Sequence, residues 1–162
     1  MRKILGIDPG QTGGLSIVDE NFNLIDCVLM PTIKTDGGKK RVDPRGVHAF
    51  ISKYNPDLAI VELVGARPGQ GVVSMFNFGD SFGQVRAIAE VLCADVRYAR
   101  PQEWRGYQGL SGLSKEQIAE VAYEIFKAEA IYGKARKDGA RAIRDGISDS
   151  LMIAKYGVRF LE

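Results

Sequence analysis

The chain has 162 residues, of which 45% are hydrophobic and 26% charged, and its formal net charge is +2. These values are typical of one globular domain, which we expect to span residues 1–162. No stretch approaches the roughly 18 apolar residues that span a bilayer, and the N-terminal apolar run ends at Asp8, too early for a signal peptide. Because Cys27 and Cys93 also lack the spacing of a zinc site, we expect a cytoplasmic protein with reduced thiols and no membrane contact.

The first part of the chain predicts four strands and one helix. Short apolar or alternating runs, bounded by Gly, Pro or polar turns, predict the strands. The apolar residues of 45–54 recur at helical spacing, and the polar, glycine-bearing segment 31–44 predicts a loop. The four expected strands cover residues 3–7, 14–18, 23–30 and 58–63.

The second part of the chain predicts helices and one more strand. A glycine-rich and aromatic segment, residues 65–79, predicts a loop that leads into a helix over residues 81–93, and residues 96–98 predict a fifth strand. Ser114 with Gln117 is typical of a capping box at a helix start. Two further helices are expected over residues 114–130 and 141–156. This order of elements predicts an α/β fold with a mixed five-stranded sheet flanked by helices.

Acidic residues lie where buried segments end. Asp8 follows the first expected strand and Glu62 lies near the end of the fourth, although burying an unpaired carboxylate costs roughly several kcal/mol. Asp145 and Asp149 are four residues apart, so they share one face of a helix. A helix cap, an ion pair or a solvent-facing edge would explain any one of these acids. Together they predict a single cluster of carboxylates.

Such a cluster predicts divalent cations. Two carboxylates about 4 Å apart repel by roughly 4 kcal/mol at an effective dielectric constant near 20. Oxygen ligands without a His or Cys cluster favour Mg²⁺ or Mn²⁺, and two ions roughly 4 Å apart can activate a water and stabilise the leaving oxygen of a phosphodiester. Gly10, Gly13 and Gly14 follow Asp8, and we expect them to leave room for a metal and a phosphate beside the backbone.

Basic residues gather in two short segments of this near-neutral chain. Residues 34–45 carry five basic and two acidic side chains, and residues 134–144 carry five basic and one acidic. Such islands indicate a local electrostatic footprint for nucleic acid, and two solvated loops are the alternative.

Four segments together resemble the RuvC family of Holliday-junction resolvases, within the RNase H-like superfamily. They are GIDPG in the first strand, IVEL in the fourth, PQEWRGYQGLSGLSKEQIAEV after the fifth and DGISDSLMIA in the last helix. The last helix and the loop GARPGQGVVSMFNFG look more like phage-type relatives than the bacterial cellular enzyme. The resemblance implies an RNase H-like fold, a homodimer, and Mg²⁺-dependent symmetric nicking of four-way DNA junctions in a bacterial or phage-infected cell.

The resemblance also implies the identity of the catalytic acids. It makes Asp8, Glu62 and Asp149 metal-binding residues and Asp145 the fourth. The bacterial pattern places its fourth ligand three residues before the last Asp, where this chain has Gly146. Asp145 therefore departs from that pattern by one position.

Further residues are expected to contact branched DNA. Phe76 and Phe78 correspond to the region near the junction centre, where a ring that stacks on an unpaired base is worth roughly 1–3 kcal/mol, or else they are core residues. Lys115 begins a helix, where its charge and the helix dipole both favour a phosphate, and we count it as catalytic. Trp104 and Arg105 are expected at the DNA-facing edge, unless Trp104 is simply packed. The expected DNA-binding set is Lys39, Lys40, Arg41, Arg67, Gln70, Phe76, Phe78, Arg105, Lys115, Lys134, Arg136 and Lys137.

Other functions compete with the junction hypothesis. A nuclease of the same superfamily that cuts flaps, forks or RNA–DNA hybrids would use the same acids. A non-catalytic module that binds branched DNA would keep the basic segments but has no need for Asp8, Glu62 and Asp149 together. The turn DPGQTGG also resembles the phosphate loop of actin-like and sugar-kinase ATPases, but those need a far longer chain, and no GxxxxGK[ST] motif is present.

Overall fold

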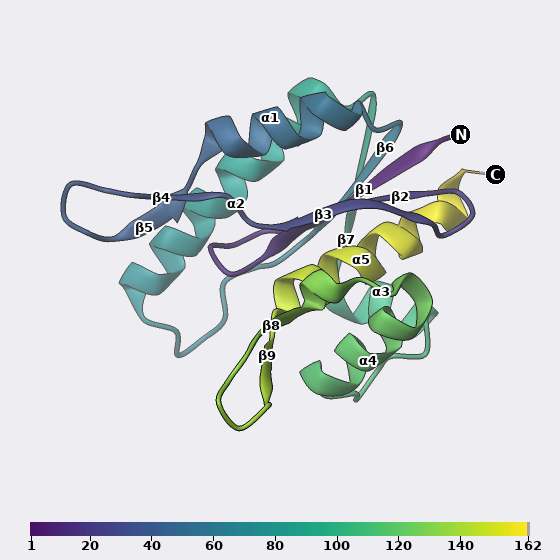
Figure 1. Ribbon diagram of the computed structural model, residues 1–162. Helices are drawn as coiled ribbons and strands as arrows, with labels where there is room; N and C mark the ends of the chain where they lie inside the picture. The colour runs from purple at the N-terminus through teal and green to yellow at the C-terminus, as the bar shows by residue number, and fades with distance from the viewer. Residues whose placement is uncertain (162) are drawn as a thin grey trace.

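The structure is a computed structural model that describes residues 1–161. A five-stranded sheet in the order β3-β2-β1-β6-β7 forms its centre (Figure 1). The first three strands form an antiparallel meander, whereas β6 runs parallel to both β1 and β7. The strands are β1 (Lys3–Asp8), β2 (Gly14–Asp19), β3 (Leu24–Leu29), β6 (Leu58–Glu62) and β7 (Asp95–Ala99). The predicted mixed five-stranded sheet is confirmed.

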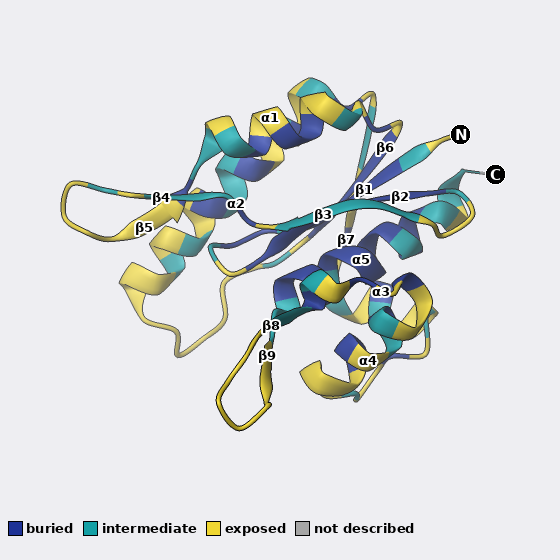
Figure 2. Ribbon diagram, viewed as in Figure 1, coloured by how far each residue is buried: buried dark blue, intermediate teal, exposed yellow. Residues whose placement is uncertain are grey.

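Helices cover both faces of the sheet, and each face has its own apolar core (Figure 1; Figure 2). Successive side chains of a strand point to opposite faces. Leu5 and Val61 therefore lie in the core under α1 and α2, while Ile4 and Ile60 lie in the core under α3, α4 and α5. The helices are α1 (Pro44–Tyr54), α2 (Val72–Leu92), α3 (Pro101–Tyr107), α4 (Lys115–Phe126) and α5 (Asp145–Gly157). Within residues 1–161, none of them is long and apolar enough to cross a membrane.

Helix α5 packs unusually close to β1 and β2, because glycines line the contact. A Cβ atom on Gly14 would lie 2.3 Å from the carbonyl oxygen of Gly146, and one on Gly13 would lie 1.9 Å from the carbonyl oxygen of Asp8. Only glycine fits at separations this short. The expectation that Gly13 and Gly14 leave room for a metal and a phosphate is therefore wrong: their missing side chains make room for α5 and for the turn after β1.

Two of the predicted loops contain regular structure. The segment 31–44 forms a hairpin of β4 (Thr32–Lys34) and β5 (Lys40–Val42), and α2 begins at Val72 instead of residue 81. Strands of three residues, with exposed or half-buried side chains except at Val42, show no clear alternation of polar and apolar residues. The first turn of α2 likewise exposes its apolar side chains, so no buried stripe marks it as a helix.

The chain between β7 and α5 also differs from the prediction. Helix α3 was not predicted, α4 ends at Phe126 rather than residue 130, and a 3₁₀ turn, η1 (Glu129–Ile131), follows it. The helix predicted from residue 141 begins only at Asp145, because residues 141–143 form β9 (Arg141–Ile143), which pairs with β8 (Tyr132–Ala135). Ile143 packs against the α5-side core from this strand, so its spacing from the apolar residues of α5 mimicked one more helical turn.

Candidate active site

The first two acids lie side by side at the same end of the sheet. In the parallel pairing of β1 with β6, Ile7 is opposite Val61, so the next residues, Asp8 and Glu62, are neighbours at the carboxyl ends of the two strands. Ile7 and Val61 both point into the core under α1 and α2. Because side chains alternate along a strand, Asp8 and Glu62 both point to the opposite face, which α5 covers.

Helix α5 brings the other two acids to this end of the sheet. Asp145 is its first residue and Asp149 lies one turn later. Ile147 and Leu151 are fully buried on the sheet side of the helix, which turns the two acids toward the loop after β1. Asp8, Asp145 and Asp149 line one cleft of about 450 Å³. The other walls of this cleft are residues 9–13, Ser74, Asn77, Phe78, Ser81, Arg105 and Lys115.

Burial and mutual repulsion both act on these carboxylates. The pKa of Asp8 is raised well above its ordinary value, first by burial and then by the charges of Glu62, Asp149 and Asp145. Burial, with repulsion from Glu62 and Asp145 and against the opposing charge of Arg105, raises the pKa of Asp149 to about 7. The pKa of Glu62 is raised by burial as well. Titratable groups perturbed in this way inside a cleft are typical of functional sites.

Three of the four acids have a partner of opposite charge or a hydrogen-bond donor. The Nζ of Lys115 donates to Asp145, Arg105 Nη2 lies 3.6 Å from Asp149 Oδ2, and the indole Nε1 of Trp104 donates to Glu62 Oε2 at 2.7 Å. The carboxylate of Asp8 has no hydrogen bond or ion pair with any side chain among residues 1–161. Asp8 is therefore the acid whose charge the protein compensates least.

The four acids lie near one another, but in this arrangement they do not form a complete metal-binding site. Among the residues that the structure describes, no group of three or more His, Cys, Asp or Glu side chains is close enough to hold one ion. Lys115, Arg105 and Trp104 occupy ligand positions of three acids instead. The donor set still fits a hard cation, because it consists of carboxylate oxygens and contains no thiol or imidazole.

Several residues expected to contact DNA lie on the walls of this cleft or next to it. Lys115 and Arg105 belong to the cleft itself, and the ring of Phe78 lies against Gly10, which follows Asp8. Arg67 and Gln70 line an adjoining cleft of about 270 Å³, which also contains Phe78. Phe76 is 76% exposed on α2 and does not line the cleft of the acids, so it is not a core residue.

Trp104 is the clearest departure from the expected site. We placed it at the DNA-facing edge, but its side chain is fully buried, so only the packed alternative holds. Its contact with Glu62 was not predicted. The available signal was the indole itself, because a buried tryptophan N–H normally requires an acceptor.

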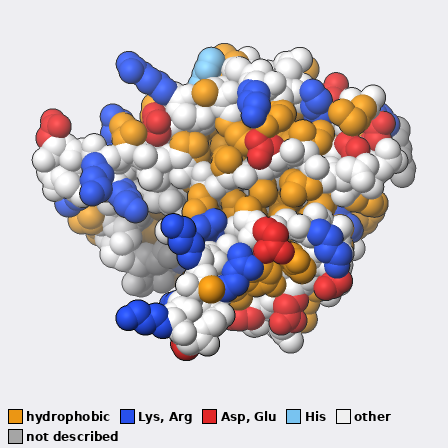
Figure 3. All heavy atoms as spheres, in the orientation of Figure 1, with side chains coloured by type: hydrophobic (Ala, Val, Ile, Leu, Met, Phe, Trp, Pro, Cys, Tyr) orange, Lys and Arg blue, Asp and Glu red, His pale blue; other side chains and the backbone are white. Residues whose placement is uncertain are grey.

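The remaining basic residues lie outside the cleft, on the two hairpins. Lys39, Lys40 and Arg41 are exposed on or beside β5, and Lys134, Arg136 and Lys137 are exposed on β8 and its turn. Figure 3 shows Lys and Arg side chains gathered over the side of the molecule from which these hairpins project. The structure therefore separates a carboxylate cleft from two basic arms.

Comparison with curated proteins identifies homologues along most of the chain. The crossover junction endodeoxyribonuclease RuvC of Paracidovorax citrulli is 27% identical over 145 residues, which cover 84% of this chain and 79% of the relative. RuvC of Cupriavidus necator is 27% identical over 153 residues, with 87% and 79% covered. No family model matches the chain.

Solved structures share the fold. Thermus thermophilus RuvC in complex with a Holliday junction substrate superposes with a TM-score of 0.63 at 20% identity, over 99% of this chain and 96% of that one. The yeast mitochondrial Holliday junction resolvase Ydc2 superposes with a TM-score of 0.52 at 15% identity, over 98% and 78%. Over most of its length the chain is thus similar in sequence to crossover junction endodeoxyribonucleases named RuvC, and it has the RNase H-like fold of the solved RuvC structure.

Proposed function

We propose that the protein is a divalent-metal-dependent endonuclease that resolves four-way DNA junctions and related branched DNA by symmetric nicking. The observation that carries this proposal is the convergence of Asp8, Glu62, Asp145 and Asp149, from three separate segments, on one face of the sheet at one end. The homology to enzymes named crossover junction endodeoxyribonucleases supports the choice of reaction and substrate.

The four acids are the proposed ligands of Mg²⁺ or Mn²⁺, with two ions as the expected number. A divalent ion held by carboxylates supplies charge neutralisation and an acidic water beside a phosphodiester. The raised pKa values of Asp8 and Asp149 support this role, because they reflect charge that the metal-free fold compensates poorly. Binding of the ion requires Asp145 and Asp149 to exchange the partners Lys115 and Arg105 for the cation.

Lys115 and Arg105 are the proposed phosphate ligands of the cleft. Both are basic residues that lie on its wall next to an acid, so each can turn from its carboxylate to a DNA phosphate. We assign Lys115 to the catalytic set for this reason. Arg67, Gln70, Phe76 and Phe78 form the proposed rim that contacts the junction, and Lys39, Lys40, Arg41, Lys134, Arg136 and Lys137 are the proposed contacts to the DNA arms.

A homodimer is part of the proposal, because two cleaved strands require two sites related by a two-fold axis. The long helix α2 supports pairing of two chains, since it exposes Val72, Val73 and Val91 to solvent. Exposed apolar side chains along one helix are typical of a surface that another protein covers. We place the reaction in the cytoplasm of a bacterium or a phage-infected cell.

The test is a nicking assay on a four-way junction, a flap, a fork, a linear duplex and an RNA–DNA hybrid, with and without Mg²⁺ or Mn²⁺. We expect paired nicks in the junction only with metal, from a protein that sediments at twice the chain mass, and a loss of at least roughly 100-fold in rate for Asp8→Asn. Glu120→Gln, on the exposed surface of α4 and outside both hairpins, is the matched control. Equal cutting of linear duplex would refute junction specificity, and binding of junctions without nicking would favour a non-catalytic module.

A further inference from the structure

The short helix α3 contacts two of the proposed metal ligands through consecutive residues. Trp104 donates its indole N–H to Glu62 Oε2 at 2.7 Å. The next residue, Arg105, lies over the Trp104 ring at 4.9 Å and places Nη2 3.6 Å from Asp149 Oδ2. Two consecutive residues of α3 thus contact one acid from β6 and one acid from α5.

Trp104 is held rigidly in its position. Its side chain is fully buried in the core that α3, α4 and α5 share, together with Leu110 and Ile118. Gln108 Nε2 donates to the carbonyl oxygens of both Trp104, at 3.0 Å, and Met152, at 2.9 Å, which ties α3 to α5. A donor fixed in this way can fix the orientation of its acceptor.

The two oxygens of Glu62 differ in their surroundings. Oε2 accepts the hydrogen bond from Trp104, whereas Oε1 accepts none from residues 1–161 and is not one of the fully buried atoms that lack a partner. The Glu62 side chain is otherwise buried, at 7% exposure. One oxygen is therefore committed to the protein, whereas the other keeps some exposure and has no protein partner, and the charge of Glu62 is near enough to Asp8 to raise the pKa of that acid.

We propose that Trp104 is a positioning residue that holds Glu62 Oε2 and thereby presents Oε1 to a divalent cation shared with Asp8. This inference rests on the proposed function, because it assumes that the acids bind metal. Hydrogen bonds to metal-ligating carboxylates orient the ligand, and their loss typically lowers metal affinity by about 10- to 100-fold. Trp104 contributes through Glu62 and does not touch the substrate.

The inference predicts a spectroscopic signature in the wild-type protein. Trp104 is the only tryptophan of the chain, so the intrinsic tryptophan fluorescence reports on a group that is hydrogen-bonded to Glu62. Titration with Mg²⁺ should change this fluorescence with the same midpoint as metal binding measured independently. Ile118→Val, in the same core, should leave the fluorescence change intact.

The decisive experiment measures Mn²⁺ affinity by electron paramagnetic resonance, without DNA. Trp104 is replaced by an analogue of the same shape in which sulphur takes the place of the indole N–H, and separately by a fluorinated tryptophan that keeps the N–H. We expect the sulphur analogue and Trp104→Phe to bind Mn²⁺ about 10- to 100-fold more weakly and the fluorinated protein to bind as wild type does. Leu110→Ala, which disturbs the same core without touching Glu62, serves as a control for lost packing.

Each outcome has a distinct meaning. Equal Mn²⁺ affinity in the sulphur analogue and the wild type would overturn the role of Trp104 while leaving the proposed function intact. An equal loss in Leu110→Ala and Trp104→Phe, with the sulphur analogue unaffected, would assign the effect to packing. A wild-type protein that binds no Mn²⁺ would refute the proposed metal site itself.

Discussion

The acids that line the cleft differ in how far a nearby positive charge compensates their negative charge. Asp145 is half-buried and has Lys115, Asp149 has the more distant Arg105, and Asp8 has no hydrogen-bond or ion-pair partner among residues 1–161. Carboxylates held together without compensating charge destabilise a fold, and residues arranged for function commonly carry such a cost. The stability of the metal-free protein should therefore depend on the protonation of these acids.

The raised pKa of Asp149 sets the direction in which the stability of the metal-free protein changes with pH. This pKa is raised from 3.8 to about 7 in the folded protein, mainly by burial, so between these values the folded chain keeps a proton that the unfolded chain releases. The free energy of unfolding should then fall as the pH rises from about 4 to about 7, and level off above that. Asp8 and Glu62, whose pKa values are also raised, add to the fall. Urea unfolding across this range, with a chelator present, measures it.

Asp149→Asn tests the assignment, because the amide cannot ionise. We expect the variant to flatten the pH dependence and to be more stable than wild type at pH 8 by roughly 1–3 kcal/mol. Glu120→Gln, on the exposed surface of α4, is the control and should leave the curve unchanged. A variant whose stability declines with pH as steeply as the wild type would show that Asp149 does not carry the effect.

At the residue scale, the proximity of the four acids could be predicted from the sequence, and their partners could not. Asp8 and Glu62 stood out because a carboxylate at the end of an apolar strand is unfavourable without a reason, and Asp145 and Asp149 because their spacing puts them on one helix face. The contact of Trp104 with Glu62 joins residues 42 positions apart. No local pattern encodes such a contact, because it depends on how α3 packs against the sheet.

Elements with a buried face were predicted, and elements without one were missed. The strands of the central sheet, α1 and most of α4 follow a regular apolar pattern that their burial requires. The two hairpins and the exposed beginning of α2 bury little, so composition alone suggested loops, or in one case a helix. The parts proposed to contact DNA were therefore the least predictable.

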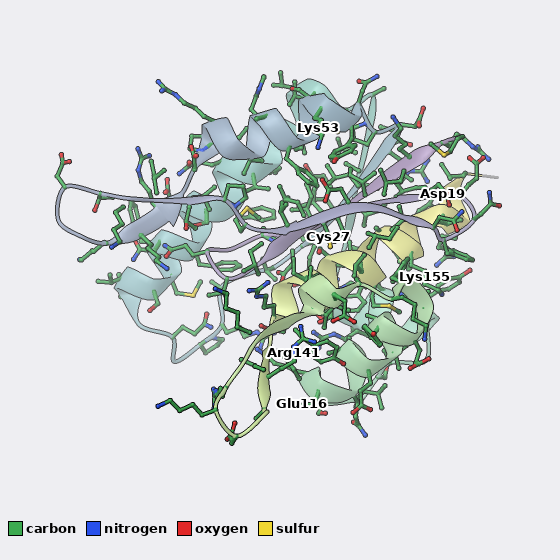
Figure 4. The ribbon with its side chains drawn as sticks, in the orientation of Figure 1. Asp19, Cys27, Lys53, Glu116, Arg141 and Lys155 are labelled. Atoms are coloured by element: carbon green, nitrogen blue, oxygen red, sulfur yellow. The ribbon has the colours of Figure 1, made fainter. Side chains whose placement is uncertain are left out.

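Arg141 fixes the base of the β8–β9 hairpin and differs in this from its basic neighbours. Its guanidinium donates to the carbonyl oxygens of Gly133, at 2.8 Å, and Tyr132, and pairs with Glu129 at 3.0 Å. Glu129 in turn accepts from the hydroxyl of Tyr123 at 2.6 Å. Figure 4 labels Arg141 close to Glu116 of α4, at the inner end of the hairpin. Arg141 therefore orients the hairpin that carries Lys134, Arg136 and Lys137.

The variant Arg141→Lys tests whether Arg141 acts by orienting the β8–β9 hairpin or only by its positive charge. Lysine keeps the positive charge but lacks the planar fork that makes several bonds at once, so the hairpin should lose its fixed orientation. We expect affinity for a four-way junction to fall about 3- to 10-fold, in line with the roughly 1 kcal/mol of a typical hydrogen bond, and trypsin to cut faster after Lys137. Fluorescence anisotropy with labelled junction DNA measures the first effect. Binding as tight as wild type would mean that Arg141 matters only as a charge.

On the scale of the whole molecule, the positions of the positive charges matter more than their number. The net charge is only +2, but the two hairpins project away from the end of the molecule where the chain termini lie (Figure 1). Lys53, in the last turn of α1, and Lys155, in the last turn of α5, lie away from both hairpins (Figure 4). DNA bound across the cleft would meet both basic arms and none of the charges at the far end.

This placement predicts which charges set the salt dependence of binding. The logarithm of DNA affinity falls with the logarithm of salt concentration at a slope of about −0.9 for each phosphate neutralised. Removing three contacts with the triple variant Lys39→Ala, Lys40→Ala and Arg41→Ala should therefore make the slope shallower by up to about 2.7. The corresponding variant of Lys134, Arg136 and Lys137 should act similarly, because both arms are exposed.

The control removes the same amount of charge from the other end of the molecule. A triple alanine variant of Arg2, Lys53 and Lys155 lowers the net charge equally but should leave the slope for junction DNA nearly unchanged, since only counterions released at contacted phosphates enter it. If all three triple variants shifted the slope alike, binding would follow net charge. The separation of the cleft from its two basic arms would then have no part in recognising branched DNA.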